Sequence, residues 1–330
     1  MSDEGRSASY EVVANISEGR SRALIERYAD AIRSSEGVTL LDVHADADHD
    51  RSVFTYVASG SDDEAGAALL AATRRLAETA IETIDLRTSN KSGAERGVHP
   101  RIGALDVVPV VPIGAGATIS GAVSIARRIA AALGALGISV HCYGAAARSE
   151  ERRSLAAIRR GEFEELADRQ RAAGGSPDFG PDEPHASAGA VAVGARPPMV
   201  AWNIELTEAA GGAPRSGGTA ALVAARSVAR AIRASSGGVD AVSGLQALGL
   251  PLVSRGVAQV SMNLHDAHAA AERGDTLHAI RATIARLAGA HGFSLGESEI
   301  VGLVHERLLR VGGNPEDLRI RGGWERAVLD

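Results

Sequence analysis

Residues 97–113, GVHPRIGALDVVPVVPI, lead from a polar loop into a run of branched aliphatic side chains. The apolar part predicts a buried β-strand, and His99, Pro100 and Arg101 stand at its mouth. A residue before proline is forced into an extended conformation, and side chains two apart in extended chain project to the same side. His99 and Arg101 should therefore point together, which places a proton carrier beside a forked donor for a carboxylate.

Packing alone offers a second interpretation of these residues, and the spacing leaves both open. In it His99 caps the strand, and Arg101 pairs with Asp106, a carboxylate inside the apolar run. A buried carboxylate needs a cation or hydrogen-bond donors. We therefore predict a structural ion pair of Asp106 with Arg101 or Arg51.

The elements around this strand follow the order strand, helix, strand, strand, helix, strand. Apolar residues and turn signals at the spacings of strands and helices predict them. They are strand 10–16, helix 24–32, strands 38–45 and 51–59, a helix from 62 to about 85, and strand 102–111. This is the split βαββαβ order of ferredoxin-like units. A helix near 119–136, a strand at 138–144, and helices near 150–161 and 163–173 follow.

The strongest break in composition is GGSPDFGPDEPHASAG, residues 174–189, where Pro, Gly, Ser and acidic residues gather. Such a segment is typical of a connection between domains, and we place the boundary at about 180–195. The predicted subdomains are residues 1–185 and 186–330. Strands and helices alternate again beyond the break, which predicts a second α/β unit of similar build.

Composition excludes several classes of protein. The chain of 330 residues has 35 Lys and Arg against 41 Asp and Glu, a net charge of −6, so it lacks the basic surface expected for nucleic-acid binding. The single cysteine, Cys142, excludes an intramolecular disulfide. No apolar stretch approaches the roughly 20 residues of a membrane span, and residues 1–11 lack the apolar region of a signal peptide. We expect a cytoplasmic protein without a membrane partner.

Residues 44–51, HADADHDR, raise the question of a metal site. They lack the glycine and glutamate that a calcium loop requires at its sixth and twelfth positions, so we expect a solvated turn beside the active cleft and no metal. The sequence also lacks a G-x-G-x-x-G or GK[ST] loop after a strand, which argues against nucleotide binding.

A set of motifs occurs in order from about Tyr10 to about Leu309. It comprises SYEVVANISEGR (9–20), HPRIGALDVVPVVPI (99–113), YGAAAR (143–148), SLAAIRRGEFEEL (154–166), PDFGP (177–181), SMNL (261–264) and SEIVGLV (298–304). In these residues the chain resembles the formiminotransferase domain of formiminotransferase-cyclodeaminase and the stand-alone glutamate formiminotransferases. The chain ends where that domain ends, so we expect the cyclodeaminase part to be absent.

The resemblance implies an α/β (α+β) fold of two ferredoxin-like subdomains, with a ligand groove between them, in a homodimer. The implied enzyme moves a formimino group from N-formimino-L-glutamate to N5 of tetrahydrofolate, its co-substrate. Its catalytic residue is His99. The implied folate-binding residues are Gly180, Pro181, Asp182, Glu183, Pro184, His185, Ala186, Ser187, Ala188 and Gly189.

Five further positions are candidates for substrate binding. Arg101 is chosen because it should lie on the same side of the chain as His99. The others match the NR pair and the YG step of the family: Asp50, Arg51, Tyr143 and Gly144.

Four positions depart from the family pattern. Val98 and Ala145 replace glutamates, and His44 and Asp50 replace an acid and an asparagine. The sequence therefore leaves the one-carbon donor open. The alternatives are a folate-dependent transferase or cycloligase that uses a formyl donor, and a folate-binding module without catalysis.

Overall fold

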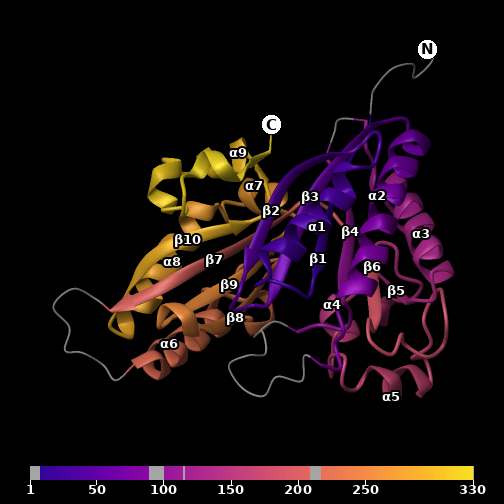
Figure 1. Ribbon diagram of the computed structural model, residues 1–330. Coiled ribbons are helices and arrows are strands. Elements are labelled where there is room, and N and C mark those ends of the chain that lie inside the picture. Colours follow the sequence, from indigo (N-terminus) through magenta and orange to yellow (C-terminus); the bar gives the residue numbers. More distant parts are fainter. Residues whose placement is uncertain (1–7, 89–99, 114–115, 209–216, 330) are drawn as a thin grey trace, which may run out of the picture. The chain divides into compact units, whose positions relative to one another are not determined.

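The computed structural model describes residues 8–88, 100–113, 116–208 and 217–329 (Figure 1). The chain divides into two compact units, Met1–Pro197 and Pro198–Asp330, rather than after residue 185 as the composition suggested. The division lies later because strand β6 (Ala190–Ala195) pairs with two strands of the first unit.

The first unit contains the predicted βαββαβ arrangement. Strand order in that part of its sheet is β2-β3-β1-β4, and every pair is antiparallel. The elements are β1 (Ala8–Ile16), α1 (Arg22–Arg33), β2 (Thr39–Asp46), β3 (Arg51–Gly60), α2 (Asp62–Thr83) and β4 (Leu105–Pro112). Helix α2 begins with a capping box between Ser61 and Glu64, which satisfies backbone N–H groups at the helix start.

Two more strands extend this sheet beyond β4. Strands β6 and β5 continue the order, and the pairs β4–β6 and β5–β6 are parallel. The added elements are α3 (Ile119–Ala135), β5 (Ser139–Gly144), α4 (Leu155–Ile158), α5 (Leu166–Arg171) and β6. The predicted helices near 150–161 and 163–173 are thus shorter than expected.

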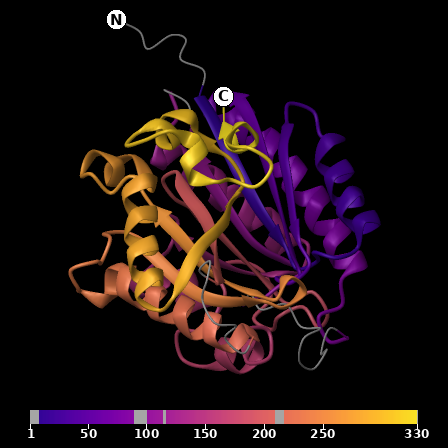
Figure 2. The same cartoon turned by 90° about the vertical axis from the view of Figure 1, so that its left-hand side faces the viewer.

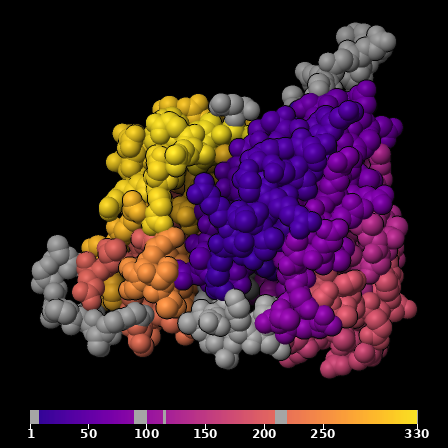
Figure 3. Space-filling model, viewed as in Figure 1, coloured from indigo at the N-terminus to yellow at the C-terminus, as the bar shows by residue number. Residues whose placement is uncertain are grey.

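The first sheet has apolar residues on both faces. Helices α1, α2 and α3 cover one face and enclose the main core, which includes Tyr10, Phe54 and Ile125 (Figure 1). A smaller cluster, with Val107, Tyr143, Ile158 and Leu166, joins the sheet to α4 and α5. Strand β2 and helix α1 expose many side chains at the surface (dark indigo in Figure 3).

The second unit is also ferredoxin-like. Its antiparallel sheet has the order β10-β7-β9-β8, and α6 and α8 cover one face (Figure 2). The elements are β7 (Met199–Glu208), α6 (Gly217–Ile232), β8 (Leu245–Leu252), β9 (Val257–His265), α7 (Ala267–Glu272), α8 (Leu277–Ala290) and β10 (Phe293–Val301). Strands β11 (Val304–His305) and β12 (Val328–Leu329) pair beside α9 (Glu306–Arg310). The two-subdomain α+β architecture predicted from the sequence is confirmed. No helix in the described part of the chain is long and apolar enough to cross a membrane.

Gly103 provides a test of the packing just before β4. A Cβ atom there would lie 1.9 Å from the carbonyl oxygen of Ala190, so we expect Gly103→Ala to lower the free energy of unfolding by about 1–3 kcal/mol or more. Exposed Gly289 near the end of α8 has no atom within 4 Å of such a Cβ, so Gly289→Ala is the control. Urea unfolding measures both, and equal stabilities would contradict the close approach.

Candidate active site

Asp106 is fully buried on β4 and receives donors from three segments. One carboxylate oxygen, Oδ2, accepts hydrogen bonds from Arg51 Nη2 (2.8 Å) and from Arg159, at the end of α4. The other, Oδ1, accepts one from the backbone N–H of Ile102 (2.8 Å). We call Asp106, Arg51 and Arg159 the Asp106 cluster. The predicted pairing of Asp106 with Arg51 is confirmed, and Arg159 takes the place considered for Arg101.

Both charges of the buried pair persist at neutral pH. Burial lowers the pKa of Arg51 to about 10, against the attraction of Asp106. Burial alone would raise the pKa of Asp106, but Arg159 and Arg51 hold it below its ordinary value. Two guanidinium groups therefore share one carboxylate, and the Asp106 cluster carries one surplus positive charge.

The cluster also holds the backbone of Pro100. Arg51 Nη2 donates to the carbonyl oxygen of Pro100 (3.0 Å), and Nη1 donates to Asn15 Oδ1 (2.9 Å). Buried Arg101 lies with Nη1 3.3 Å from a carboxylate oxygen of Glu164, between α4 and α5. His99 lies outside the described residues.

Asp50, another candidate, lies in the link between β2 and β3. Its backbone is left-handed (φ 48°), and its carboxylate accepts from Gly19 N–H and Arg20 Nη1, both at 3.4 Å. A Cβ on Gly19 would lie 2.3 Å from the backbone nitrogen of Arg51, so only glycine permits this close approach. These contacts hold the Ser-Glu-Gly-Arg turn of residues 17–20 beside the start of β3.

Structural contacts explain the Tyr143-Gly144 step at the end of β5. Tyr143 is buried against the smaller apolar cluster. Burial raises the pKa of its phenol, the charges of Arg196 and Arg159 oppose this rise, and the charge of Asp106 adds to it. Gly144 is left-handed (φ 61°), and a Cβ there would lie 2.5 Å from the carbonyl oxygen of Ala195. Tyr143 therefore lies near the Asp106 cluster.

A buried carboxylate precedes the 180–189 loop. The side chain of Asp178 is 1% exposed, and its Oδ2 accepts from the N–H of Cys142 (2.6 Å). Arg148 (3.1 Å) and Arg152 (3.2 Å) form ion pairs with it. Arg148 also lies over the ring of Phe179, 5.2 Å from its centroid. These contacts hold the Pro-Asp-Phe-Gly-Pro motif against β5.

The first half of the 180–189 loop continues along β5. Ser139 Oγ lies 2.7 Å from the carbonyl oxygen of Pro181 and 3.0 Å from that of Glu183. Gly180 is left-handed (φ 82°), and a Cβ there would lie 2.0 Å from the carbonyl oxygen of Ile138. The loop is thus part of the first unit, and the interpretation of residues 174–189 as a plain connection between domains is wrong.

The second half of the loop meets the segment that follows Arg101. The N–H of Ala104 donates to the carbonyl oxygen of Ala188 (2.9 Å), and Gly103 and Gly189 form a single antiparallel bridge. The structure therefore brings the end of the 180–189 loop next to residues 103 and 104, which follow Arg101 in the chain.

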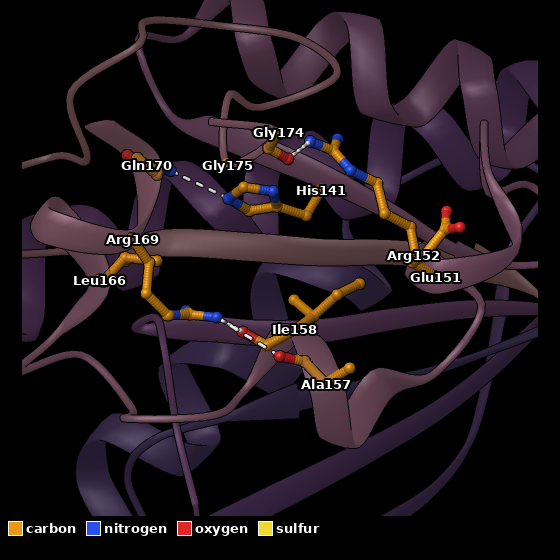
Figure 4. Close-up of a pocket in the computed structure, with 10 residues that line it drawn as sticks. All are labelled: His141, Glu151, Arg152, Ala157, Ile158, Leu166, Arg169, Gln170, Gly174 and Gly175. Carbon is orange, nitrogen blue, oxygen red and sulfur yellow. Dashed lines mark hydrogen bonds between the residues drawn. The ribbon is translucent and has the colours of Figure 1, made fainter. Parts of the chain in front are cut away.

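A small cavity lies between β5, α4, α5 and the segment at residues 174–175 (Figure 4). It has a volume of about 130 Å3 and is lined by His141, Glu151, Arg152, Ala157, Ile158, Leu166, Arg169, Gln170, Gly174 and Gly175. Typical ligand pockets measure roughly 300–1,000 Å3, so this cavity does not suit a molecule as large as a folate. It contains none of the residues predicted from the sequence to form the site, but Arg152 belongs both to its wall and to the ion pairs of Asp178.

His141 is the ionisable group at the centre of this wall. Its Nε2 lies 2.9 Å from the amide nitrogen of Gln170, so the ring is neutral and accepts there (Figure 4). Burial, followed by the charge of Arg152, lowers its pKa to about 4. Alternation along β5 puts Ser139, His141 and Tyr143 on one face of the sheet. This alternation was the signal in the sequence that could have identified His141 as a residue lining the cavity.

Two ferredoxin-like units define an α+β protein, and a fold alone does not fix its function. Residues 9–196, over half of the chain, match the family model described as "Formiminotransferase domain, N-terminal subdomain". The chain belongs to the formiminotransferase family.

Curated relatives agree with this assignment. The chain is 35% identical to glutamate formimidoyltransferase of Streptococcus pyogenes, over 91% of this chain and 90% of that one. It is 36% identical to the enzyme of the same name from Thermoplasma acidophilum, over 91% and 89%. The formimidoyltransferase-cyclodeaminase of Gallus gallus is 35% identical over 91% of this chain, which spans 50% of that protein.

Removal of the charge of Asp106 should strongly destabilise the fold, because it leaves Arg51 and Arg159 buried without a counter-ion. We expect Asp106→Asn to lower the free energy of unfolding by about 3–5 kcal/mol. Asp168→Asn is the control, since that carboxylate is 88% exposed and its pair with Arg171 should contribute little. Urea unfolding at pH 7 compares them, and a loss below about 1 kcal/mol for Asp106→Asn would contradict the account.

His141 should make the protein acid-sensitive. Its pKa is about 4 in the folded protein against an ordinary value of 6.5, so only the unfolded chain takes up the proton between these values. The contribution of neutral His141 to the free energy of unfolding is complete above pH 6.5, and about 3 kcal/mol of it is lost as pH falls to 4. His141→Gln keeps an acceptor for Gln170 and should flatten this slope in urea unfolding at pH 7, 5.5 and 4.5. Parallel profiles for the variant and the wild type would reject the assignment.

Proposed function

We propose that this chain is a glutamate formimidoyltransferase, which moves the formimino group of N-formimino-L-glutamate to N5 of tetrahydrofolate. Family membership and relatives of that name that span nearly the whole chain support the proposal. The structural observation that carries it is the hydrogen-bonded contact between the 180–189 loop and residues 102–104. This contact supports the proposal because it links the end of the proposed folate loop to the residues that directly follow Arg101.

His99 is the proposed general base and acid. As N5 of the folate attacks the amidine carbon, a C–N bond forms and N5 loses a proton, which neutral His99 accepts. The bond from that carbon to the glutamate nitrogen then breaks, and His99 returns the proton to the departing nitrogen. One residue thus serves both half-steps, and no redox partner is needed.

The chain's own charges suit an anionic donor. We propose that Arg101, Arg51, Asp50, Tyr143 and Gly144 bind the substrate. The surplus positive charge of the Asp106 cluster favours a carboxylate nearby. Arg101 already faces Glu164, so in this role it would exchange that partner for a carboxylate of the substrate.

The folate would lie along the 180–189 loop, mostly against backbone groups. A folate with a polyglutamate tail is strongly anionic, so we propose that Asp182 and Glu183 face away from the tail. The carboxylate of Glu183 forms a salt bridge with Arg171 (2.9 Å), and both side chains are exposed. This pair lowers the repulsion that a free carboxylate would exert on an anion.

We further propose a cytoplasmic homodimer with no nucleic-acid or membrane partner. The net charge of −6 and the resemblance to a dimeric family support this. Light scattering coupled to size-exclusion chromatography should give about twice the mass of 33.9 kDa.

An assay of tetrahydrofolate with N-formimino-glutamate, followed by the absorbance of the folate product, tests the function. Wild type should turn over, and His99→Ala should lower kcat by roughly 100-fold or more, because acid–base catalysis contributes about that much. His291→Ala, a half-buried histidine of the second unit, is the matched control. A His99→Ala rate within a fewfold of wild type would remove His99 from the mechanism.

The same assay with a panel of formyl donors tests the alternative function. The alternative is motivated by Ala145, which stands where the family has glutamate and has no polar side chain for a donor. Its backbone N–H already donates to the carbonyl oxygen of Ala195 (2.8 Å). Preference for a formyl compound would replace the proposed donor. Folate binding without turnover of any donor would indicate a binding module instead.

A further inference from the structure

We infer that His185 is a positioning residue, which holds the end of the 180–189 loop in shape through its Nδ1 atom. The expected effect of His185 on folate binding rests on the proposed function, whereas its hydrogen bonds are seen in the structure. Residues 185–189 form a tight turn that closes on itself: the N–H of His185 donates to Gly189 O (3.0 Å), and the N–H of Gly189 donates to His185 O (2.8 Å).

The imidazole of His185 folds back into this turn. Its Nδ1 accepts from the N–H of Ala188 (3.1 Å) and more weakly from that of Ser187 (3.4 Å). Ser187 Oγ also lies 3.4 Å from the same nitrogen. The ring therefore supplies an acceptor to N–H groups inside a turn, where the five-residue loop has few backbone acceptors to offer.

These contacts decide which ring nitrogen carries the proton. Two backbone N–H groups point at Nδ1, and a protonated nitrogen cannot accept from either. In this geometry Nδ1 carries no proton, so the N–H of the ring is on Nε2. The half-buried ring presents that Nε2–H away from the turn as a fixed donor.

The turn transmits its shape to the proposed catalytic segment. The carbonyl oxygen of Ser187 accepts from the N–H of Leu86 (2.8 Å), and that of Ala188 accepts from the N–H of Ala104 (2.9 Å). Without the Nδ1 acceptor, the N–H groups of Ser187 and Ala188 lose their partner, and both carbonyl groups become free to turn. His185 thus acts through the loop on the register between residues 186–189 and 102–104.

A pair of amide replacements separates positioning from direct contact. The Oδ1 of asparagine reaches about the place of Nδ1, whereas the side chain of glutamine reaches about the place of Nε2. We expect His185→Asn to keep the KM for tetrahydrofolate within about twofold of wild type. His185→Gln should raise it on the order of tenfold, because lost charge-neutral hydrogen bonds have effects of this size, with kcat changed less.

Every other pattern overturns the inference. If glutamine preserves the KM and asparagine does not, His185 contacts the ligand through Nε2 instead. If both variants raise it equally, or neither does, the Nδ1 acceptor has no positioning role. The KM-against-kcat split distinguishes positioning from a loss of fold, which would lower the active fraction and kcat.

Nitrogen-15 spectra of the histidine rings test the geometry without any activity. The ring of His185 in the intact wild-type protein at pH 7 should show a bare Nδ1 and a protonated Nε2, with the His185→Asn spectrum giving the assignment. A proton on Nδ1 would overturn the inference. If wild type shows no formimino transfer, the proposed function fails, and this spectrum still decides the role of His185.

Discussion

A carboxylate with no exposure to solvent must be matched by donors, and Asp106 obtains them from β3, from the end of α4 and from the backbone of Ile102. Arg51, held in this way, also fixes the carbonyl group of Pro100. The positions of β4 and of the segment from Pro100 that leads into it therefore depend on one ion cluster.

The 180–189 loop is also held in place by the rest of the first unit. Glycine and proline give it an irregular path, but backbone hydrogen bonds and the ion pairs of Asp178 hold both its ends. A loop ordered before binding loses less conformational entropy when a ligand arrives. The order of the 180–189 loop is therefore set by the chain itself before any ligand binds.

Much of the fold could be predicted because its signals are local. Apolar spacing located the split βαββαβ unit. A carboxylate inside an apolar strand predicted a buried ion pair with Arg101 or Arg51, and Arg51 is one of the partners found. The role of Arg159 could not be found, because it comes from a distant short helix with no local mark. Strand β6 was placed in the wrong unit, since an extended run does not show in its own residues which strands it pairs with. The Pro/Gly composition of residues 174–189 predicted irregular backbone correctly, but carried no information on what holds it.

We expect residues 102–104, which precede β4, and residues 186–189 at the end of the loop to form one cooperative structure. Native-state hydrogen exchange of the wild-type protein tests it at the amides of Ile102, Ala104 and Ala188, whose acceptors are Asp106, Ala188 and His185. The account predicts one shared free energy of opening for all three amides. Exchange of Ala104 and Ala188 at a much lower free energy than Ile102 would show that the loop opens independently, and would contradict it.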